Sequence, residues 1–569
     1  MKKYDFIKVL IAQRKVQFIS LMLFEILIWS FPLAEGLLLK KFFDSLQYKQ
    51  IDYMSLAILV LLSLLNIFTM RIYFKNNVSY GYFINSHIKK NMMHFLLENR
   101  SSSGLQSSVG SIVNVFSEDV GNMEASVTWF STVIGQLFRG IGALVILFLI
   151  NYQVALFAVL PLLIVIIITN KMEGKIRKNT SESRSTTAKV SDFIEEMFSY
   201  VMTIKTSLAK NNMLTELEEL NEDRYHAKLK ESLWENILST LYKNTTNFGT
   251  GIILLVSAYS ISRGEFTIGD LSIFIFYLVY ITDTIESVSN FNIFLAQTNI
   301  SIENIQKKLG MPESINLLCG KNNLGFEEKE DENLDTNDSY KFDEIHVDSL
   351  SYHYPESTIG INSVSFQLLR GETICICGKT GAGKTTLLKC ILGLIKPDEG
   401  FITVDGDICN RLQPPLSSYV SQNPTLLSDS IENNIKLGDN EVSMNDILYY
   451  SVLENDLGSF TNGLETEIGS NSGRVSGGQK HRIAIARMYA RNSELLFMDD
   501  TTSALDKITE AKFWNRYFSS ERTGIIVSNK KEILHKADKV IYIEDGEVKS
   551  LSNLNNILID YPETCEFLL

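Results

Sequence analysis

Long apolar runs dominate the first part of the chain, whereas apolar and polar positions alternate in short segments after it. Six stretches before residue 310 are apolar over close to the roughly 20 residues that a helix needs to cross a bilayer. They cover residues 18–39, 54–74, 128–150, 154–170, 247–262 and 271–294, and the fourth and fifth are expected to extend into their flanks. A soluble bundle would need a very large core to bury them all. The pattern therefore predicts six membrane-spanning helices.

The segments between these spans are uneven in length. Spans three and four are joined by little more than two residues, and spans five and six by a short turn at residues 263–270. The segments after spans two and four are long, polar and periodic. By the positive-inside rule these segments and the basic start of the chain face the cytosol. The basic residues concerned are Lys2, Lys3, Lys8, Arg14, Lys15, Lys89, Lys90, Arg100, Lys171, Lys175, Arg177 and Lys178. Long cytosolic helices with short outer turns indicate a transporter rather than a simple anchor.

Ionisable side chains fall inside three of the predicted spans. Glu25 and Glu35 lie in the first, Arg139 in the third, and Asp283 and Glu286 in the sixth. A charge at this depth must face a partner or a wet cavity. One interpretation is an acidic lining that favours cationic or amphipathic cargo. We favour the other, in which Arg139 pairs structurally with a carboxylate and Glu35 lies at the outer interface.

Composition limits the partners and the compartment. The chain has 569 residues, so we expect two or more domains. Its net charge of −13 argues against a nucleic-acid surface, so no nucleic-acid partner is expected. The six cysteines follow no metal-type spacing and are interpreted as reduced cytosolic thiols. The first span has no small-residue cleavage site, so it is expected to be retained as a helix.

The composition changes sharply after the sixth span. Residues 320–340 are rich in Asn, Asp and Glu and bury too little apolar surface to order themselves. We therefore predict a membrane domain over residues 1–310, an acidic linker over 311–341 and a soluble domain over 342–569.

The soluble domain contains a glycine-rich phosphate motif. Residues 378–385 read G-K-T-G-A-G-K-T, follow the apolar run Thr373–Cys377 and precede a helix-like stretch at 386–393. In this strand–loop–helix context the backbone N–H groups and the helix N-terminus attract phosphate oxygens. Lys384 would reach the β- and γ-phosphates, and the Thr385 hydroxyl would bind Mg²⁺. The predicted nucleotide-binding residues of the loop are Gly378, Lys379, Thr380, Gly381, Ala382, Gly383, Lys384, Thr385 and Thr386.

Further motifs follow in order. The apolar strand 495–498 ends in Asp499 and Asp500, a Walker B pattern in which Asp499 would hold Mg²⁺, through water. Between the two motifs lie Gln422 and the run Ser-Gly-Gly-Gln at 476–479. A helix-like stretch at 481–490 follows this run, so a second helix N-terminus would point at phosphate.

Over nearly its full length the chain resembles an ATP-binding cassette (ABC) exporter of the half-transporter type. The resemblance implies a multi-domain fold: a six-helix α transmembrane domain of the type I exporter, followed by an α/β P-loop NTPase cassette. In this family two cassettes close face to face, and the P-loop of one and the signature motif of the other sandwich each ATP. The chain is therefore expected to dimerise, with itself or with a different subunit.

The resemblance also assigns roles to particular residues. Tyr354 matches the aromatic residue that stacks on adenine. Gln422 matches the Q-loop residue, so the resemblance implies that Gln422 binds Mg²⁺ together with Thr385 and Asp499. The signature motif is matched by Val475, Ser476, Gly477, Gly478 and Gln479, with valine in place of the usual leucine. The D-loop is matched by Ser503, Ala504, Leu505 and Asp506. Regions 117–122 and 203–210 resemble the coupling helices.

Three further departures from the family pattern bear on the mechanism. Asp500 stands where a glutamate usually polarises the attacking water, and its carboxylate is set back by about one methylene. Asn529 stands at the place of the switch histidine; it can hydrogen-bond to phosphate but cannot titrate. Ser470 replaces a glutamate upstream of the signature motif. We expect Asp500, Gln422 and Asn529 to form an attenuated catalytic set in which ATP binding survives and hydrolysis is slow.

Three functions remain open. An exporter subunit, the degenerate half of a heterodimer, is favoured; a slow homodimeric exporter and an ATP-gated regulator without sustained transport are the alternatives. The cargo could be a small peptide, a drug or a lipid. The expected location is a bacterial cell membrane, with the N-terminus and the cassette in the cytosol.

Overall fold

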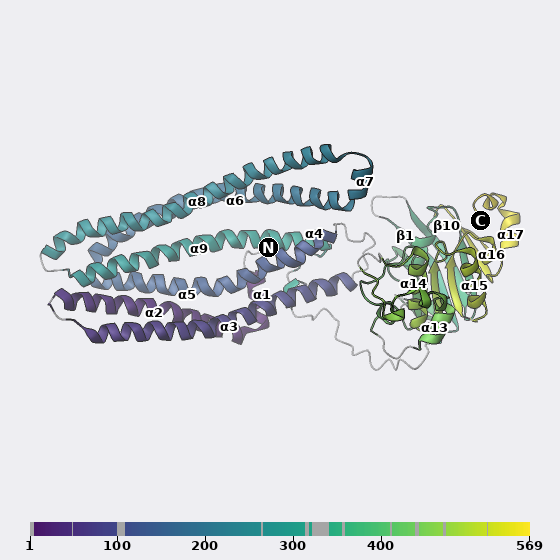
Figure 1. The fold of residues 1–569 in the computed structure, drawn as a ribbon, viewed down its shortest axis with the longest axis horizontal. Helices are drawn as coiled ribbons and strands as arrows, with labels where there is room; N and C mark the ends of the chain where they lie inside the picture. The colour runs from purple at the N-terminus through teal and green to yellow at the C-terminus, as the bar shows by residue number, and fades with distance from the viewer. Residues whose placement is uncertain are drawn as a thin grey trace. The chain divides into compact units, whose positions relative to one another are not determined.

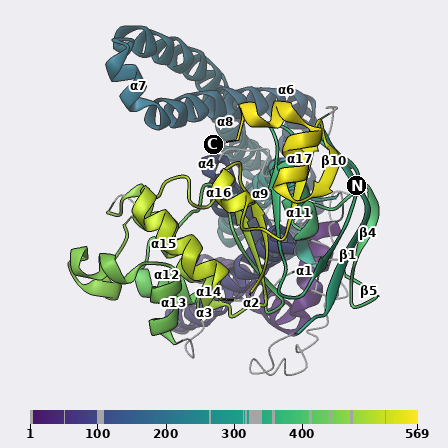
Figure 2. The ribbon, with the colours of Figure 1, turned by 90° about the vertical axis from the view of Figure 1, so that its right-hand side faces the viewer.

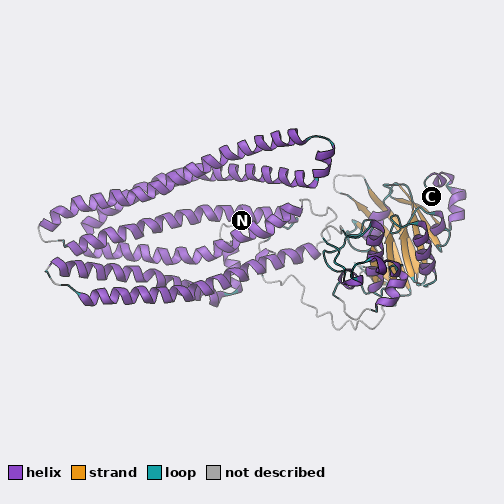
Figure 3. Cartoon of the chain, in the orientation of Figure 1, coloured by secondary structure: helices purple, strands orange, loops and turns teal. Residues whose placement is uncertain are grey.

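The computed structural model describes residues 5–47, 49, 51–98, 109–262, 266–312, 314, 318–320, 341–354, 359–409, 412, 414–438, 443–469, 474–520 and 522–568. The chain divides into two compact units, one helical and one containing all of the described strands (Figure 3). Each unit is described by itself. The predicted linker residues 321–340 and Ser470 lie outside the described residues.

The helical unit is built from long helices (Figure 1). Its elements are α1 (Asp5–Gln13), α2 (Lys15–Gln47), α3 (Tyr53–Glu98), α4 (Val109–Asn114), the π-helical turn η1 (Val115–Asp119), α5 (Val120–Ile150), α6 (Tyr152–Ser199), α7 (Val201–Thr206), α8 (Lys210–Ser262) and α9 (Ile268–Leu309). Each of the six predicted spans lies on one of the six long helices α2, α3, α5, α6, α8 and α9, which confirms the predicted fold class.

The spans differ in how clearly they meet the requirements of a membrane crossing. Within the described residues, four helical runs are long and apolar enough: Lys15–Gln47, Tyr53–Leu97, Gly110–Ile150 and Ile268–Leu309. On α6 the apolar run that could be assessed among the described residues is Tyr152–Pro161, and the sequence itself continues apolar to Ile168. The fourth and fifth predicted spans nevertheless continue into helices of 48 and 53 residues.

Local signals explain where these helices begin and end. The Asn151 side chain accepts hydrogen bonds from the backbone N–H groups of Gln153 and Val154, both at 3.1 Å, so the chain turns directly from α5 into α6. Thr267 and Asp270 form a reciprocal capping box at the start of α9. Gly310 ends α9 with a φ of +65°, a conformation that favours glycine.

Packing groups the helices into pairs. The helix α6 packs along α8, and α5 packs along α9, while α2 contacts α3, α5 and α9 (Figure 1). After α9 the chain folds back onto this unit. Leu318 and Cys319 are fully buried, and the Asn91 side chain donates to the Leu318 carbonyl at 3.0 Å. Residues 318–320, which the sequence assigns to the linker, thus belong to the helical core.

The second unit contains two sheets. Its strands are β1 (Glu344–His353), β2 (Gly360–Leu369), β3 (Thr373–Cys377), β4 (Glu399–Val404), β5 (Asp407–Ile408), β6 (Ser417–Val420), β7 (Leu495–Asp499), β8 (Thr523–Val527), β9 (Lys539–Glu544) and β10 (Glu547–Ser552). Its helices are α11 (Lys384–Ile391), α12 (Ile431–Lys436), α13 (Met444–Tyr450), α14 (Gly477–Ala490), α15 (Lys507–Phe518), α16 (Lys531–Leu534) and α17 (Leu554–Asp560).

The larger sheet has the strand order β10-β9-β3-β8-β7-β6, and the smaller one has the order β2-β1-β4-β5. Strands β3, β7 and β8 are buried at every position, as expected for parallel strands that are covered on both faces. Figure 2 shows β1, β4 and β5 on one side of this unit and α12 to α15 on the other. The buried parallel strands end at one common edge, and the candidate site lies there.

Candidate active site

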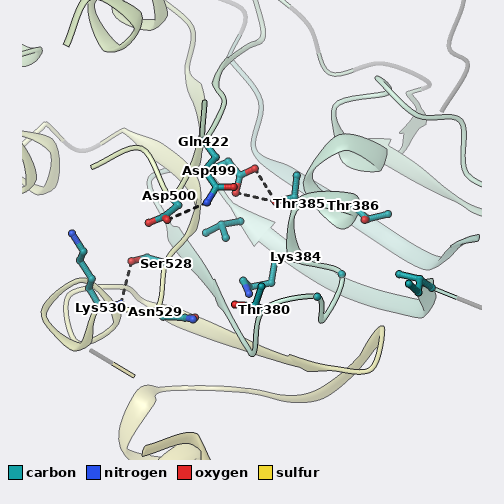
Figure 4. Close-up of a pocket in the computed structure, with 14 residues that line it drawn as sticks. Thr380, Lys384, Thr385, Thr386, Gln422, Asp499, Asp500, Ser528, Asn529 and Lys530 are labelled. Carbon is teal, nitrogen blue, oxygen red and sulfur yellow. Dashed lines mark hydrogen bonds between the residues drawn. The ribbon is translucent and has the colours of Figure 1, made fainter. Parts of the chain in front are cut away.

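Three parallel strands bring the predicted phosphate residues together. The strand β3 pairs with β8, and β8 pairs with β7, so the carboxyl ends of all three meet at one edge of the sheet. A cavity of about 430 Å³ opens there (Figure 4). It is lined by Ile359, Thr380, Gly381, Gly383, Lys384, Thr385, Thr386, Gln422, Asp499, Asp500, Val527, Ser528, Asn529 and Lys530.

The phosphate loop depends on glycine for its course. Gly383 has a φ of +99° and immediately precedes α11, and a Cβ atom at this position would lie 2.9 Å from the Gly360 carbonyl oxygen. Any other residue would be strained there. The glycine therefore allows α11 to begin at the cavity with its N–H groups free to face an anion.

Lys384 folds back onto its own loop. Its Nζ donates to the carbonyl oxygens of Gly378 at 2.7 Å and Lys379 at 2.8 Å. Burial lowers the pKa of Lys384, and the nearby carboxylates of Asp499 and Asp500 oppose this shift. The ammonium group is held at the cavity by two neutral acceptors, which an anion can replace.

Thr385 and Asp499 are already in contact. The Thr385 hydroxyl donates to the two Asp499 carboxylate oxygens at 2.9 and 3.2 Å (Figure 4). Burial raises the pKa of Asp499, while the hydrogen bond from Thr385 lowers it. A hydroxyl and a single carboxylate fit Mg²⁺, which binds through one or two carboxylates together with phosphate oxygens and water. The described residues hold no group of three His, Cys, Asp or Glu side chains that could bind a metal by itself.

Asp500 directly follows Asp499 and lines the same cavity (Figure 4). It has a φ of +43°, and its carboxylate accepts a long hydrogen bond of 3.5 Å from the Gln422 amide. Burial raises the pKa of Asp500, and the charge of Lys530 opposes this shift. The three predicted catalytic residues Gln422, Asp500 and Asn529 all line the same cavity.

Asn529 is engaged with the phosphate loop. Its side-chain oxygen accepts from the Gly378 N–H at 3.2 Å, and its side-chain nitrogen donates to the Gly378 carbonyl at 3.0 Å. These two hydrogen bonds tie β8 to the loop after β3. An amide can make both at once and at any pH, because it is a donor and an acceptor without titrating.

Lys530 is a lining residue that the sequence interpretation missed. Its ammonium group forms an ion pair of 2.5 Å with Glu510. Its backbone N–H donates to the Ser528 hydroxyl at 3.2 Å (Figure 4). The sequence feature that could have identified Lys530 is a basic residue directly after Asn529, the position of the switch histidine.

Other predicted residues lie outside this cavity. The Tyr354 hydroxyl is 3.4 Å from the Thr386 hydroxyl, and its ring contacts the Tyr352 ring edge-on at 5.2 Å. Ser476 and Gln479 form a capping box that begins α14 at Gly477, four residues earlier than the predicted helix-like stretch. Asp506 of the D-loop caps α15 by accepting from the N–H groups of Ile508 and Thr509. The described signature residues 475–479 do not line this cavity.

Two protein families match this chain. Residues 16–285 match the family described as "ABC transporter transmembrane region", and residues 361–503 match the family described as "ABC transporter". Fused in this order, the two regions define a membrane transporter that carries its own ATPase. The chain belongs to the ABC transporters and has the exporter arrangement of an ATP-binding and permease protein.

Known relatives agree with this assignment. A protein of Bacillus subtilis named "Probable multidrug resistance ABC transporter ATP-binding/permease protein" is 26% identical over 70% of this chain and 68% of its own length. A β-(1→2)glucan export ATP-binding/permease protein of Bartonella henselae is 30% identical over 55% of this chain and 52% of its own length. The structure of a bacterial Atm1-family ABC exporter with ATP bound matches the fold with a TM-score of 0.79 at 18% identity, and the match covers 98% of both chains.

Proposed function

We propose that this chain is the catalytically attenuated half of a heterodimeric ABC exporter. The proposal rests on a difference between two groups of residues that meet at the cavity. Lys384, Thr385 and Asp499 are arranged to receive ATP and Mg²⁺, whereas the shortened Asp500 reaches Gln422 only at 3.5 Å and Asn529 is bound to the Gly378 backbone. ATP binding is thereby retained, and activation of the attacking water is weakened.

Each group has a distinct role in this proposal. Lys384 and the loop N–H groups hold the β- and γ-phosphates, and Thr385, Asp499 and Gln422 hold the Mg²⁺ ion, which neutralises phosphate charge. Asp500 orients water poorly, because a displacement of about 1 Å can lower a rate by about 10²-fold. Tyr354 supports the adenine.

The signature residues Ser476, Gly477 and Gly478 serve the ATP bound by the partner subunit. The position of Ser476 at the start of a 14-residue helix, away from this chain's own phosphate cavity, supports a role in the partner's site. ATP binding then closes the two cassettes and switches the membrane domains, and hydrolysis at the partner's site resets them. We place the protein in a bacterial cell membrane with the cassette in the cytosol, and the cargo is a small peptide, a drug or a lipid.

A gain-of-function experiment tests the attenuation. The double variant D500E/N529H restores the family residues. In nanodiscs that hold the chain together with a second half-transporter, whose own catalytic glutamate is replaced by glutamine so that only this site turns over, the ATPase rate should rise by about 10²-fold or more. The single variants serve as controls and should show smaller gains. An already fast wild-type chain, or a double variant no faster than wild type, would contradict the proposal.

Reconstitution into vesicles distinguishes an exporter from an ATP-gated regulator. The chain and a second half-transporter with an intact glutamate and histidine should together drive vectorial uptake into inverted vesicles. A regulator would instead change shape with nucleotide but accumulate nothing.

A further inference from the structure

Charged, aromatic and hydroxyl side chains from three helices contact one another within the helical unit. Glu25 and Trp29 come from α2, Thr132 and Arg139 from α5, and Tyr280 and Asp283 from α9. We call these six residues the Arg139 cluster. They lie within three predicted spans, where an ionisable group is expected to serve a function unless it is fully paired.

Arg139 is held between two rings. Its guanidinium carbon lies 4.3 Å from the centre of the Trp29 ring and 4.5 Å from that of Tyr280, in cation–π geometry. The residue is only 4% exposed, and its Nε has no hydrogen-bond partner among the described residues. The guanidinium is thus fixed in place but incompletely satisfied.

The ion pair of Arg139 is loose. Its terminal nitrogen lies 3.6 Å from an Asp283 carboxylate oxygen, longer than the 2.7–2.9 Å typical of a charge-assisted hydrogen bond. The Asp283 side chain is 49% exposed in the single chain, whereas that of Arg139 is 5% exposed. The carboxylate is therefore the charge that a ligand can reach.

Glu25 adds a second negative charge to the cluster, and two neutral donors rather than a positively charged side chain satisfy its carboxylate. Its carboxylate oxygens accept from the Trp29 indole N–H at 2.8 Å and from the Thr132 hydroxyl at 2.5 Å. Both partners donate, which suits an ionised carboxylate. The cluster then contains two carboxylates and one guanidinium, so its net charge favours a cation.

We propose that the Arg139 cluster is a cargo-contact site for cationic amphipathic molecules. The positive group of the cargo binds the side of the Asp283 carboxylate that Arg139 leaves open, and its apolar body packs against the rings of Tyr280 and Trp29. This inference rests on the proposed export function and narrows the class of its cargo.

Two ions of similar size and opposite charge test the site. Tetraphenylphosphonium and tetraphenylborate are titrated separately into the nucleotide-free full-length protein in nanodiscs of zwitterionic lipid, with binding to empty nanodiscs subtracted. The wild type should prefer the phosphonium, and D283N should bind it about tenfold more weakly or worse. D283E, which keeps the charge, should remain within about threefold of the wild type.

A matched control removes a carboxylate elsewhere in the same unit. Glu222 lies on α8, its side chain is 71% exposed and it pairs with His226, so E222Q should not change the affinity for the phosphonium. Equal or tighter binding of the borate by the wild type would overturn the inference. So would a D283N protein that melts at a lower temperature yet binds the phosphonium as well as the wild type, because the ion pair would then be structural only.

Failure of this inference can be told from failure of the proposed function. The titration contains no nucleotide, so a protein that does not retain ATP but still selects the cation would refute only the export function. A D283N protein that does not fold leaves the wild-type comparison of the two ions to decide.

Discussion

The phosphate cavity of the cassette and the Arg139 cluster of the helical unit both bury charge, but they stabilise it by different means. In the cassette, Lys384 has two backbone carbonyl acceptors and Asp499 has a hydroxyl donor, all between 2.7 and 3.2 Å. In the helical unit, Arg139 contacts two ring faces and one carboxylate at long range, and its Nε finds no hydrogen-bond partner in the part of the chain that the structure describes.

The difference follows from the backbone available in each region. At the ends of parallel strands the loops present free N–H and C=O groups, so polar side chains find close partners. Within membrane helices the backbone groups are already paired, so a charge must depend on side chains alone. The cassette can therefore fix its charges tightly before a ligand arrives, while the bundle leaves one carboxylate available.

The largest effect is expected in the cassette, where the charges have close hydrogen-bond partners. Lys384→Ala removes the half-buried ammonium group at the phosphate loop, so ATP affinity should fall by about 30-fold or more, measured with fluorescent ATP in nanodiscs. Lys549→Ala is the matched control. Lys549 lies on β10 outside the cavity and pairs with Glu547 at 2.7 Å, so the loss should be under about twofold. Similar losses in both variants would contradict a specific role for Lys384.

A smaller loss is expected when the loosely held cation is removed. Arg139→Met leaves Asp283 without its counter-ion and removes both ring contacts, which should destabilise the protein by about 2 kcal/mol, less than for a fully buried pair because Asp283 is half exposed. A lower melting temperature in detergent would show this. Arg139→Lys keeps the charge and should recover part of the loss; an unchanged transition in Arg139→Met would mean that the pair contributes nothing.

Acid should weaken Mg²⁺-dependent binding in the cassette. Burial raises the pKa of Asp499 above its usual range, so its carboxylate takes up a proton at a higher pH than the roughly 3.9 of an exposed aspartate. Since Mg²⁺ needs the ionised form, the gain in ATP affinity on adding Mg²⁺ should shrink as the pH falls toward that raised pKa. Titrations with and without Mg²⁺ at several pH values measure this gain. Asp499→Asn should show little Mg²⁺-dependent gain in ATP affinity at any pH. A gain in the wild type that does not change with pH would refute the assignment of Asp499 as a Mg²⁺ ligand.

The smallest change is expected at Asp500. General-base catalysis typically contributes about 10²–10⁴-fold, so Asp500→Asn would be severe in a competent site but should alter turnover of this chain by less than about tenfold. The ATPase rate of the purified chain gives the answer. A loss of about 100-fold would show that Asp500 is an effective base and would favour the homodimeric exporter.

Much of both regions could be predicted from local sequence. The apolar runs gave the six long helices, and the glycine pattern at 378–385 gave a loop that the structure places between β3 and α11. The pairing of Arg139 with a carboxylate was also expected, and Asp283 proves to be that partner. Lys530 was missed, because its position in the cavity depends on how β8 lies beside β3.

The sequence by itself determined the class of transporter, the location of its phosphate loop and the residues that depart from the family pattern, because these depend on short-range order along the chain. Only the tertiary structure decided which groups meet: Asn529 with Gly378, Thr385 with Asp499, and Arg139 with Trp29 and Tyr280. These contacts join elements separated by more than 100 residues, and packing of the sheet and the bundle, rather than local propensity, brings them together.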